Sequence, residues 1–151
     1  MGKYIGVKMV EAVPMTELTY LETVKGMGRD GDDRHGYKIT YPDGYVSWSP
    51  KNVFEKAYMQ VGNNNTIVEK NISDFILDYN VKQWGEKTTI VMASLANGFI
   101  LTESSSCVDA ANFNMDIGES ICKEKIKNRL WEMLGFLLQT AKNGVKKCPR
   151  I

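Results

Sequence analysis

The sequence predicts an α+β fold, in which a small antiparallel sheet accompanies an N-terminal strand, hairpin and helix module and a long C-terminal helix. Two turn signals, Pro42-Asp43-Gly44 and Asn97-Gly98, each lie between stretches of alternating apolar and polar residues, which is typical of β-hairpins. Apolar residues then recur at helical spacing after Asn114, and Gly144 ends that pattern.

An N-terminal module is predicted for residues 1–60. Alternating apolar residues indicate a strand within residues 4–15, and Pro14 ends it. Thr16 is a suitable N-cap for the short helix that comes next, and Gly26 is a suitable residue to close that helix.

A second helix is expected directly after the first hairpin, with Ser49 as its N-cap and Pro50 at its first position. Gly62 is then followed by three consecutive asparagines, a composition typical of a linker. We therefore place a boundary here and expect residues 61–151 to form a hairpin and long-helix region for ligand binding and oligomerisation.

This second region is predicted to begin with a short helix, which Ser73 caps and which includes residues 76–77, and a turn follows near Trp84. Two strands flank the second hairpin turn, and a turn-rich connector leads to the long helix, which starts at Asn114 or Asp116. The predicted apolar stripe of this helix consists of Ile117, Ile121, Ile126, Leu130, Met133, Leu134, Leu137 and Leu138.

The composition indicates a cytoplasmic protein. The 151 residues carry a formal net charge of +1, which disfavours a general nucleic-acid binder. No apolar run approaches the roughly 18 residues that a membrane helix needs. The cysteines Cys107, Cys122 and Cys148 are odd in number and widely spaced, which favours reduced thiols. We therefore expect neither a membrane nor a nucleic acid as a partner.

The sequence contains no recognisable motif for catalysis. A lone His35 cannot complete a zinc cluster. The glycines of residues 26–36 are not followed by the Lys-Ser or Lys-Thr of a phosphate loop, and Asp30, Asp32 and Asp33 lack the spacing of a calcium loop. We expect a binding protein rather than an enzyme, without a cofactor or a metal.

Polar residues and one aromatic residue gather around the second hairpin and the connector. Amide and hydroxyl groups at loop ends orient polar ligands, and an aromatic ring directly after the turn can stack on a nucleobase. Basic residues of the long helix can neutralise phosphates. The candidate ligand-binding residues are Asn97, Phe99, Ser106, Asp109, Asn112, Lys125, Lys127 and Arg129.

A purely structural interpretation of the same residues stays open. Asn97 then serves a positive φ angle in the turn, and Phe99 belongs to the core. Asp109 and Asn114 then act as helix caps, and the mixed lysine and glutamate residues form a solvated helix face. This alternative leaves no ligand site in the hairpin.

Two stretches carry longer motifs. Residues 88 to 138 contain "L-x-NGF", a Ser-Cys step, "NFN", "IG" and "W-x-x-x-GF-x-L", and this pattern resembles a family of small tailed-phage proteins. Residues 4 to 58 contain "YPDGYVSWSPK" and resemble an accessory module at the front of several phage and prophage proteins. The first pattern is carried by Leu95, Asn97, Gly98, Phe99, Ser106, Cys107, Asn112, Phe113, Asn114, Ile117, Gly118, Trp131, Gly135, Phe136 and Leu138.

The phage family is similar to the Thoeris anti-defence sponges of the first type. The resemblance implies binding of cyclic ADP-ribose isomers made by bacterial TIR-domain proteins, without cleavage, by homodimers or larger homo-oligomers. It also implies that Phe99 stacks on the base, that residues 109–112 contact the ribose or base, and that a basic helix residue meets the pyrophosphate. The candidates for the pyrophosphate contact are Lys123, Lys125, Lys127 and Arg129, with Arg129 or Lys127 favoured.

These patterns give three hypotheses of different classes. The first is a phage anti-defence protein that sequesters a cyclic ADP-ribose-type signal in the host bacterial cytoplasm, and thereby counteracts TIR-based Thoeris defence. The alternative is a phage protein-interaction or structural module that binds a host protein. The third is a nucleotide-processing enzyme, for which the sequence offers no visible general base.

Overall fold

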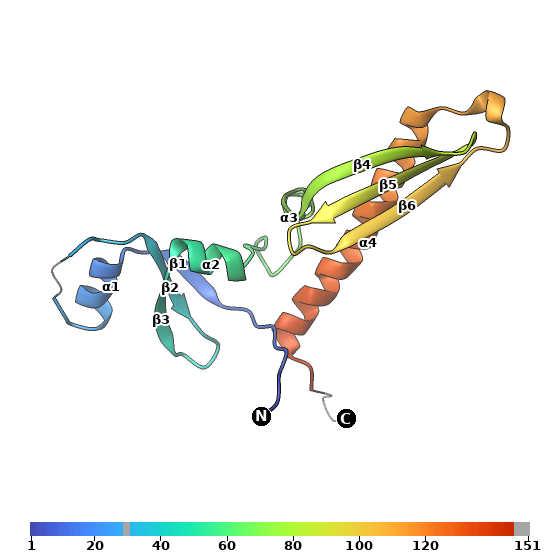
Figure 1. The fold of residues 1–151 in the computed structure, drawn as a ribbon. Coiled ribbons are helices and arrows are strands. Elements are labelled where there is room, and N and C mark those ends of the chain that lie inside the picture. Colours follow the sequence, from blue (N-terminus) through green and yellow to red (C-terminus); the bar gives the residue numbers. More distant parts are fainter. Residues whose placement is uncertain (29–30, 147–151) are drawn as a thin grey trace. The chain divides into compact units, whose positions relative to one another are not determined.

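A computed structural model describes residues 1–28 and 31–146, so that Asp30 and Cys148 lie outside the described residues. It contains two antiparallel sheets of three strands each, several helices and one long C-terminal helix, which confirms the predicted α+β class (Figure 1). Contacts within the chain define two units. The N-terminal unit is Met1–Gln60 with the chain from Gln139 onward, and the sheet–helix unit is Val61–Leu138.

The N-terminal unit has a sheet of order β1-β2-β3 and two short helices. The predicted strand within residues 4–15 is much shorter in the structure, because only Glu11 to Pro14 find partners along β2. A hydrogen bond from the Met9 amide to the Ala141 carbonyl holds the preceding segment instead. The elements are β1 Glu11–Pro14, α1 Glu17–Val24, β2 Gly36–Thr40, β3 Val46–Pro50 and α2 Lys51–Ala57.

The helix ends of this unit match the prediction at α1 and differ at α2. The Thr16 side chain accepts a hydrogen bond from the Thr19 amide, as expected of an N-cap. Ser49 was expected to cap α2, but it lies in the β2–β3 ladder opposite Tyr37, and Pro50 takes the cap position without a side-chain bond. The extended backbone that pairing requires of Ser49 therefore decides where α2 begins.

Close packing around Trp48 organises the N-terminal sheet. The indole Nε1 donates to the Met15 carbonyl at 2.7 Å, and a Cβ atom on Gly36 would lie 2.2 Å from the Ser49 carbonyl oxygen. Only glycine fits at that position. On α2, Phe54 stacks between Tyr37 and Tyr58 with ring centroids 4.3 and 4.8 Å away.

The sheet–helix unit has a meander of order β4-β5-β6. The helix predicted from Ser73 is displaced: it begins at Glu69, where the Asn71 side chain accepts from the Val68 amide, and it ends at Phe75. Residues 76–84 form a strand that the prediction missed. The elements are α3 Glu69–Phe75, β4 Ile76–Trp84, β5 Thr88–Leu95, β6 Ile100–Ser106, a 3-10 turn Ala110–Asn112 and α4 Met115–Asn143.

Helix α4 begins and ends as predicted. The Asn114 side chain accepts from the Ile117 amide, which selects Asn114 over Asp116 as the N-cap. Gly144 follows the last residue with a φ of 72°, and its amide donates to the Thr140 carbonyl. No described helix combines the length and the apolar character that a membrane span requires.

The buried line of α4 differs from the predicted stripe. The residues without appreciable exposure recur every fourth position, whereas Ile117, Ile121, Met133 and Leu137 are exposed. Because a turn takes 3.6 residues, a four-residue repeat moves around the helix by about 40° per step. This drift lets α4 stay in contact with a twisted sheet. The buried residues of α4 are Gly118, Cys122, Ile126, Leu130 and Leu134.

The closest approach of α4 to the sheet is at Gly118. A Cβ atom there would lie 2.3 Å from the Thr89 hydroxyl oxygen and 2.7 Å from the Thr89 Cβ. Thr89 shares one face of β5 with Val91, Ala93 and Leu95, and all four residues are fully or almost fully buried. The line on α4 and this row on β5 together form the core of the unit.

The two hairpins use the same turn. In each, the glycine amide donates to the carbonyl three residues earlier, and Gly44 and Gly98 have φ angles of 86° and 85°. An Asp43 or Asn97 side-chain oxygen accepts from the amide two residues later. This is a type I turn followed by a glycine bulge, and an aromatic residue follows the glycine in both cases.

Gly118→Ala is expected to destabilise the protein by about 1–3 kcal/mol, because the added methyl group meets a buried Thr89 that has no room to move. Gly135→Ala, in the same helix but with nothing within 4 Å of its Cβ position, is the matched control and is expected to stabilise by about 0.5–1 kcal/mol. Urea denaturation measures both. Equal effects of the two substitutions would contradict this packing.

Candidate functional site

The basic residues of α4 divide between its two flanks. Lys125 Nζ donates to the Ser104 carbonyl at 2.9 Å, and Arg129 Nη1 donates to the Thr102 carbonyl at 3.3 Å. Arg129 also pairs with the Glu103 carboxylate at 2.7 Å. Because β6 is an edge strand, these contacts occupy carbonyl groups that no further strand covers.

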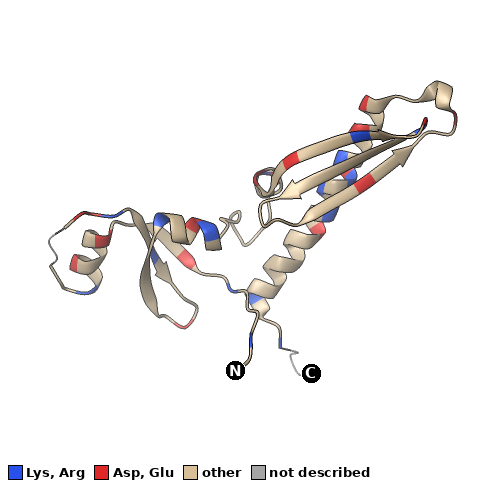
Figure 2. Ribbon diagram, viewed as in Figure 1, with Lys and Arg blue, Asp and Glu red and all other residues tan. Residues whose placement is uncertain are grey.

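The other flank of α4 faces β4. Lys123 Nζ lies 4.7 Å from the centre of the Tyr79 ring and pairs with Glu119 at 2.5 Å. Lys127 pairs with Glu69 of α3 at 3.3 Å. In the ribbon of Figure 2, the blue positions of lysine and arginine lie mainly along the middle of α4. An open hollow of about 640 Å³ on this flank is lined by Tyr79, Asp116, Glu119, Ser120, Lys123, Glu124 and Lys127.

Sequence reasoning missed Tyr79 because it missed β4. The usable signal was the alternation of Tyr79 and Val81 with polar Asp78, Asn80 and Lys82. In the sheet, Tyr79 and Val81 pair with the buried Ala93 and Val91, so they lie on the face that α4 covers.

Phe99 lies at the tip of the second hairpin with 51% of its surface exposed. Its amide donates to the Asn97 side chain, so Asn97 holds the turn through a hydrogen bond and not through a positive φ angle. Strand alternation places Phe99 on the same face as the buried Leu101. The aromatic ring is therefore held on the α4 side of the sheet without being part of the core.

One connector residue acts as a helix cap, as the purely structural interpretation expected. The Asp109 side chain accepts from the Ala111 amide and opens the 3-10 turn, while the Asn112 side chain is exposed. Ser106 forms a 2.8 Å hydrogen bond with the Thr88 hydroxyl across the strands.

Strand β6 separates the two halves of the expected site. Phe99 precedes this seven-residue strand, and Asp109 and Asn112 follow it. At about 3.3 Å per residue, the two ends of β6 lie about 20 Å apart. A single chain therefore does not bring the hairpin tip and the connector together, and Lys125 and Arg129 lie at the strand between them.

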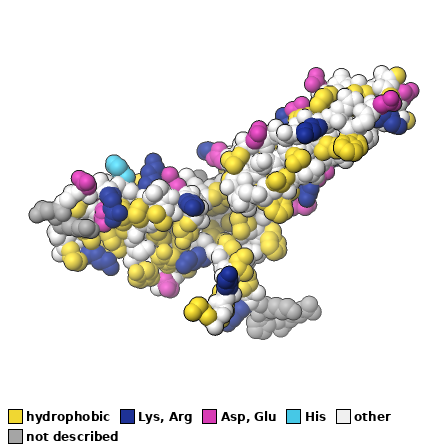
Figure 3. Space-filling model, viewed as in Figure 1, with side chains coloured by type: hydrophobic (Ala, Val, Ile, Leu, Met, Phe, Trp, Pro, Cys, Tyr) yellow, Lys and Arg dark blue, Asp and Glu magenta, His cyan; other side chains and the backbone are white. Residues whose placement is uncertain are grey.

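Exposed apolar residues continue the flank of α4 that faces β6. Together with Lys125 and Arg129 they form a row with a four-residue repeat, which we call the seam row; its first five members each directly precede a residue of the buried line. Its first member, Ile117, is 60% exposed and its last, Leu137, is 38% exposed. Figure 3 shows hydrophobic side chains at the surface of this unit. The seam row consists of Ile117, Ile121, Lys125, Arg129, Met133 and Leu137.

Metal-binding side chains do not converge in this arrangement. Within residues 1–28 and 31–146, no group of three His, Cys, Asp or Glu side chains could hold a metal ion. Burial raises the pKa of the Cys122 thiol, which keeps this side chain protonated inside the core.

A family model described as the phage protein (N4 Gp49/phage Sf6 gene 66) family matches residues 51–142, well over half of the chain. The chain belongs to this phage protein family. The match begins at the first residue of α2 and includes the whole β4-β5-β6 sheet, the hollow and the seam row. The N4 Gp49/Sf6 gene 66 family is a phage protein family, as the motif of residues 88 to 138 predicted. No curated protein and no solved structure matches the chain.

Phe99→Ala is expected to cost far less stability than Leu101→Ala, which lies two residues further along the chain, in β6. Leu101 is 1% exposed, so its truncation leaves a cavity that costs about 2–5 kcal/mol. The half-exposed ring of Phe99 leaves no such cavity. Chemical denaturation of both variants checks this, and equal losses would restore the core interpretation of Phe99.

Proposed function

We propose that this phage protein binds and sequesters a cyclic ADP-ribose-type immune signal without degrading it, and so counteracts TIR-based Thoeris defence in the host bacterial cytoplasm. The observation that carries the proposal is the half-exposed ring of Phe99, held on an ordered hairpin whose core does not use it. A rigid aromatic face of this kind suits stacking on a purine base, since such stacking does not depend on the base's edge. The motif resemblance names the ligand class.

The remaining predicted residues match the other parts of such a ligand. Exposed amide and carboxylate groups of Asn112 and Asp109 suit ribose hydroxyl groups. Lys125 and Arg129 suit the pyrophosphate, because both now bind mainly carbonyl oxygens and a single carboxylate, which leaves positive charge for an anion. Lys127 already pairs with Glu69 on the other flank and is the weaker candidate.

A second copy completes the site. The seam row has the same chemistry from either end, with apolar residues at both ends and basic residues in the middle. Two antiparallel α4 helices would place Ile117 opposite the partner's Leu137 and Ile121 opposite the partner's Met133. Because α4 begins directly after the connector, this arrangement carries Phe99 of one copy toward the connector of the other. Arg129 is one helical turn, about 6 Å, from Met133 at that end.

Isothermal titration calorimetry, in which cyclic ADP-ribose isomers are titrated into the full chain, tests the proposal. At least one isomer is expected to bind, and denaturation of the complex is expected to release it chemically unchanged. Phe99→Ala is expected to abolish binding while the protein stays folded, because the base loses its stacking surface.

Tyr45→Ala is the matched control, since Tyr45 occupies the same position in the other hairpin and is also exposed. It is expected to bind like the wild type. Absence of binding by every isomer at micromolar protein would contradict the proposal and favour the host-protein alternative. Release of a cleaved ligand would identify an enzyme instead.

A further inference from the structure

The two edges of the β4-β5-β6 sheet differ. Lys125 and Arg129 bind carbonyl groups along β6, whereas β4 pairs with β5 alone among the described strands and, after a bulge at Ile76–Asp78, presents a regular outer side from Asp78 to Trp84. β4 also carries the exposed Leu77 and Trp84. A long edge strand with exposed hydrophobic residues is a surface on which another strand can pair.

We propose that β4 pairs with β4 of a second copy, antiparallel and across a two-fold axis at Asn80. This register places Asp78 opposite the partner's Lys82, and the two-fold repeats that ion pair on the other side of the axis. It also places Tyr79 opposite the partner's Val81, and the regular part of the strand, from Asp78 to Lys82, carries this register, since a bulge separates Ile76 from Asp78. Opposite charges and aromatic–β-branched pairs directly across a ladder both stabilise antiparallel pairing.

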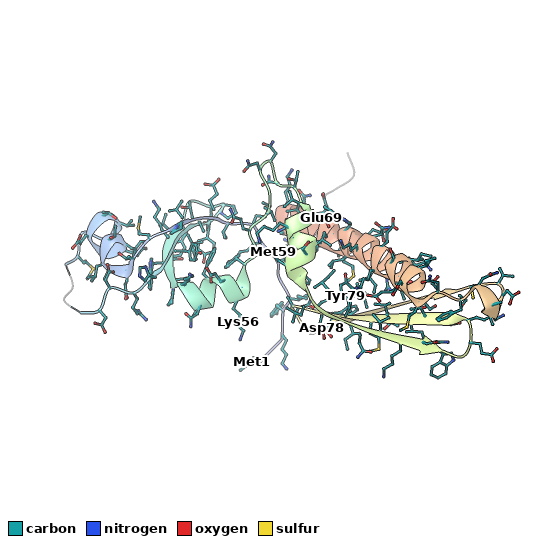
Figure 4. The ribbon with its side chains drawn as sticks, turned by 90° about the horizontal axis from the view of Figure 1, so that it is seen from above. Met1, Lys56, Met59, Glu69, Asp78 and Tyr79 are labelled. Carbon is teal, nitrogen blue, oxygen red and sulfur yellow. The ribbon has the colours of Figure 1, made fainter. Side chains whose placement is uncertain are left out.

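Both faces of the strand support this register. Asp78, Asn80 and Lys82 alternate with Tyr79 and Val81, whose partners on β5 are buried beneath α4. Figure 4 shows Tyr79 directed toward α4 and Asp78 on the other side of the sheet. The charged pairs would therefore lie on the open face, and the apolar pairs would lie beside the hollow.

The hollow fits a second copy as well. Its lining is acidic near the start of α4, at Asp116 and Glu119, and further on it carries Lys123 and Lys127 with a single acidic residue, Glu124, between them. An antiparallel partner would place the acidic half of one copy opposite the half of the other copy that carries the lysines. Lys123 lies over Tyr79, and α4 runs opposite to β4. The two-fold axis through Asn80 is therefore level with Ile121 on α4, since one strand residue spans about two helix residues. This axis brings Glu119 opposite the partner's Lys123.

The spacing of the layers agrees with this contact. Three strand intervals separate β5 from the partner's β5, so two α4 helices centred on these strands would lie about 14 Å apart. A helix with its side chains is about 10–12 Å across, so long charged side chains of the two helices would meet above the hollow.

This β4 interface is independent of the proposed function and lies on the flank of α4 opposite the seam row. Together with the seam-row contact of the proposed function, it would give the chain two different two-fold interfaces, and such a chain assembles beyond a dimer, either into a closed ring or into a longer array. The proposed occupant of the β4 edge is therefore a second copy of this chain, and loss of that contact lowers the mass of the assembly without loss of ligand binding.

Charge reversal of the full chain tests the register. Asp78→Lys and Lys82→Asp are each expected to lower the mass measured by light scattering to that of a seam-row dimer or a monomer, because each puts like charges opposite one another twice. The double variant D78K/K82D is expected to restore the wild-type mass. Thermal unfolding of each variant confirms that it is folded. Wild-type mass in both single variants, or no restoration in the double variant, would overturn the proposal.

A cysteine at the axis gives a second readout. Asn80→Cys, in a chain with Cys107 and Cys148 replaced by serine, is expected to form a disulfide-linked dimer, because only a residue on the two-fold axis meets itself at a distance that a disulfide spans. Asn128→Cys, on the exposed back of α4, is the control and is expected to stay unlinked. Absence of the Asn80→Cys link under oxidising conditions would overturn the pairing.

Discussion

The four-residue line of buried contacts between α4 and the sheet is the constraint on which the sheet–helix unit depends. Close approach at Gly118 fixes the line at one end, and Leu134 continues it toward the other. Because the line drifts with the twist of the sheet, the residues on each side of it stay next to the same edge strand along the helix. One flank lies along β6 and carries the seam row, and the other lies along β4 and lines the hollow.

These two flanks give one chain two different surfaces. The flank along β6 combines apolar residues with Lys125 and Arg129, which cover an edge strand now and can meet an anion in an assembled site. The flank along β4 combines paired charges with Tyr79 and leaves a long edge open. In the assembly that we propose, the first surface would join site residues that one protomer keeps apart, and the second would extend the assembly beyond a dimer.

Local chemistry determined which features could be predicted from the sequence. Both hairpins, the Thr16 cap and the end at Gly144 were predictable, because turns and caps depend on adjacent residues. β4 was missed because Ile76 and Leu77 resemble a continued helix, and the buried line of α4 was missed because it depends on the twist of a distant sheet. Asp109 was identified as a possible cap, whereas the exposure of Phe99 and the partnership of Tyr79 with Lys123 required the tertiary structure.

A site shared between two copies is the central claim, and subunit complementation tests it most directly. Phe99→Ala and Asn112→Ala chains are each expected to fail to bind a cyclic ADP-ribose isomer as homo-oligomers. After the two are unfolded and refolded together, each mixed pair regains one intact site, so calorimetry is expected to detect about one site for every four chains. A mixture that binds no more than its separate components would contradict the shared site.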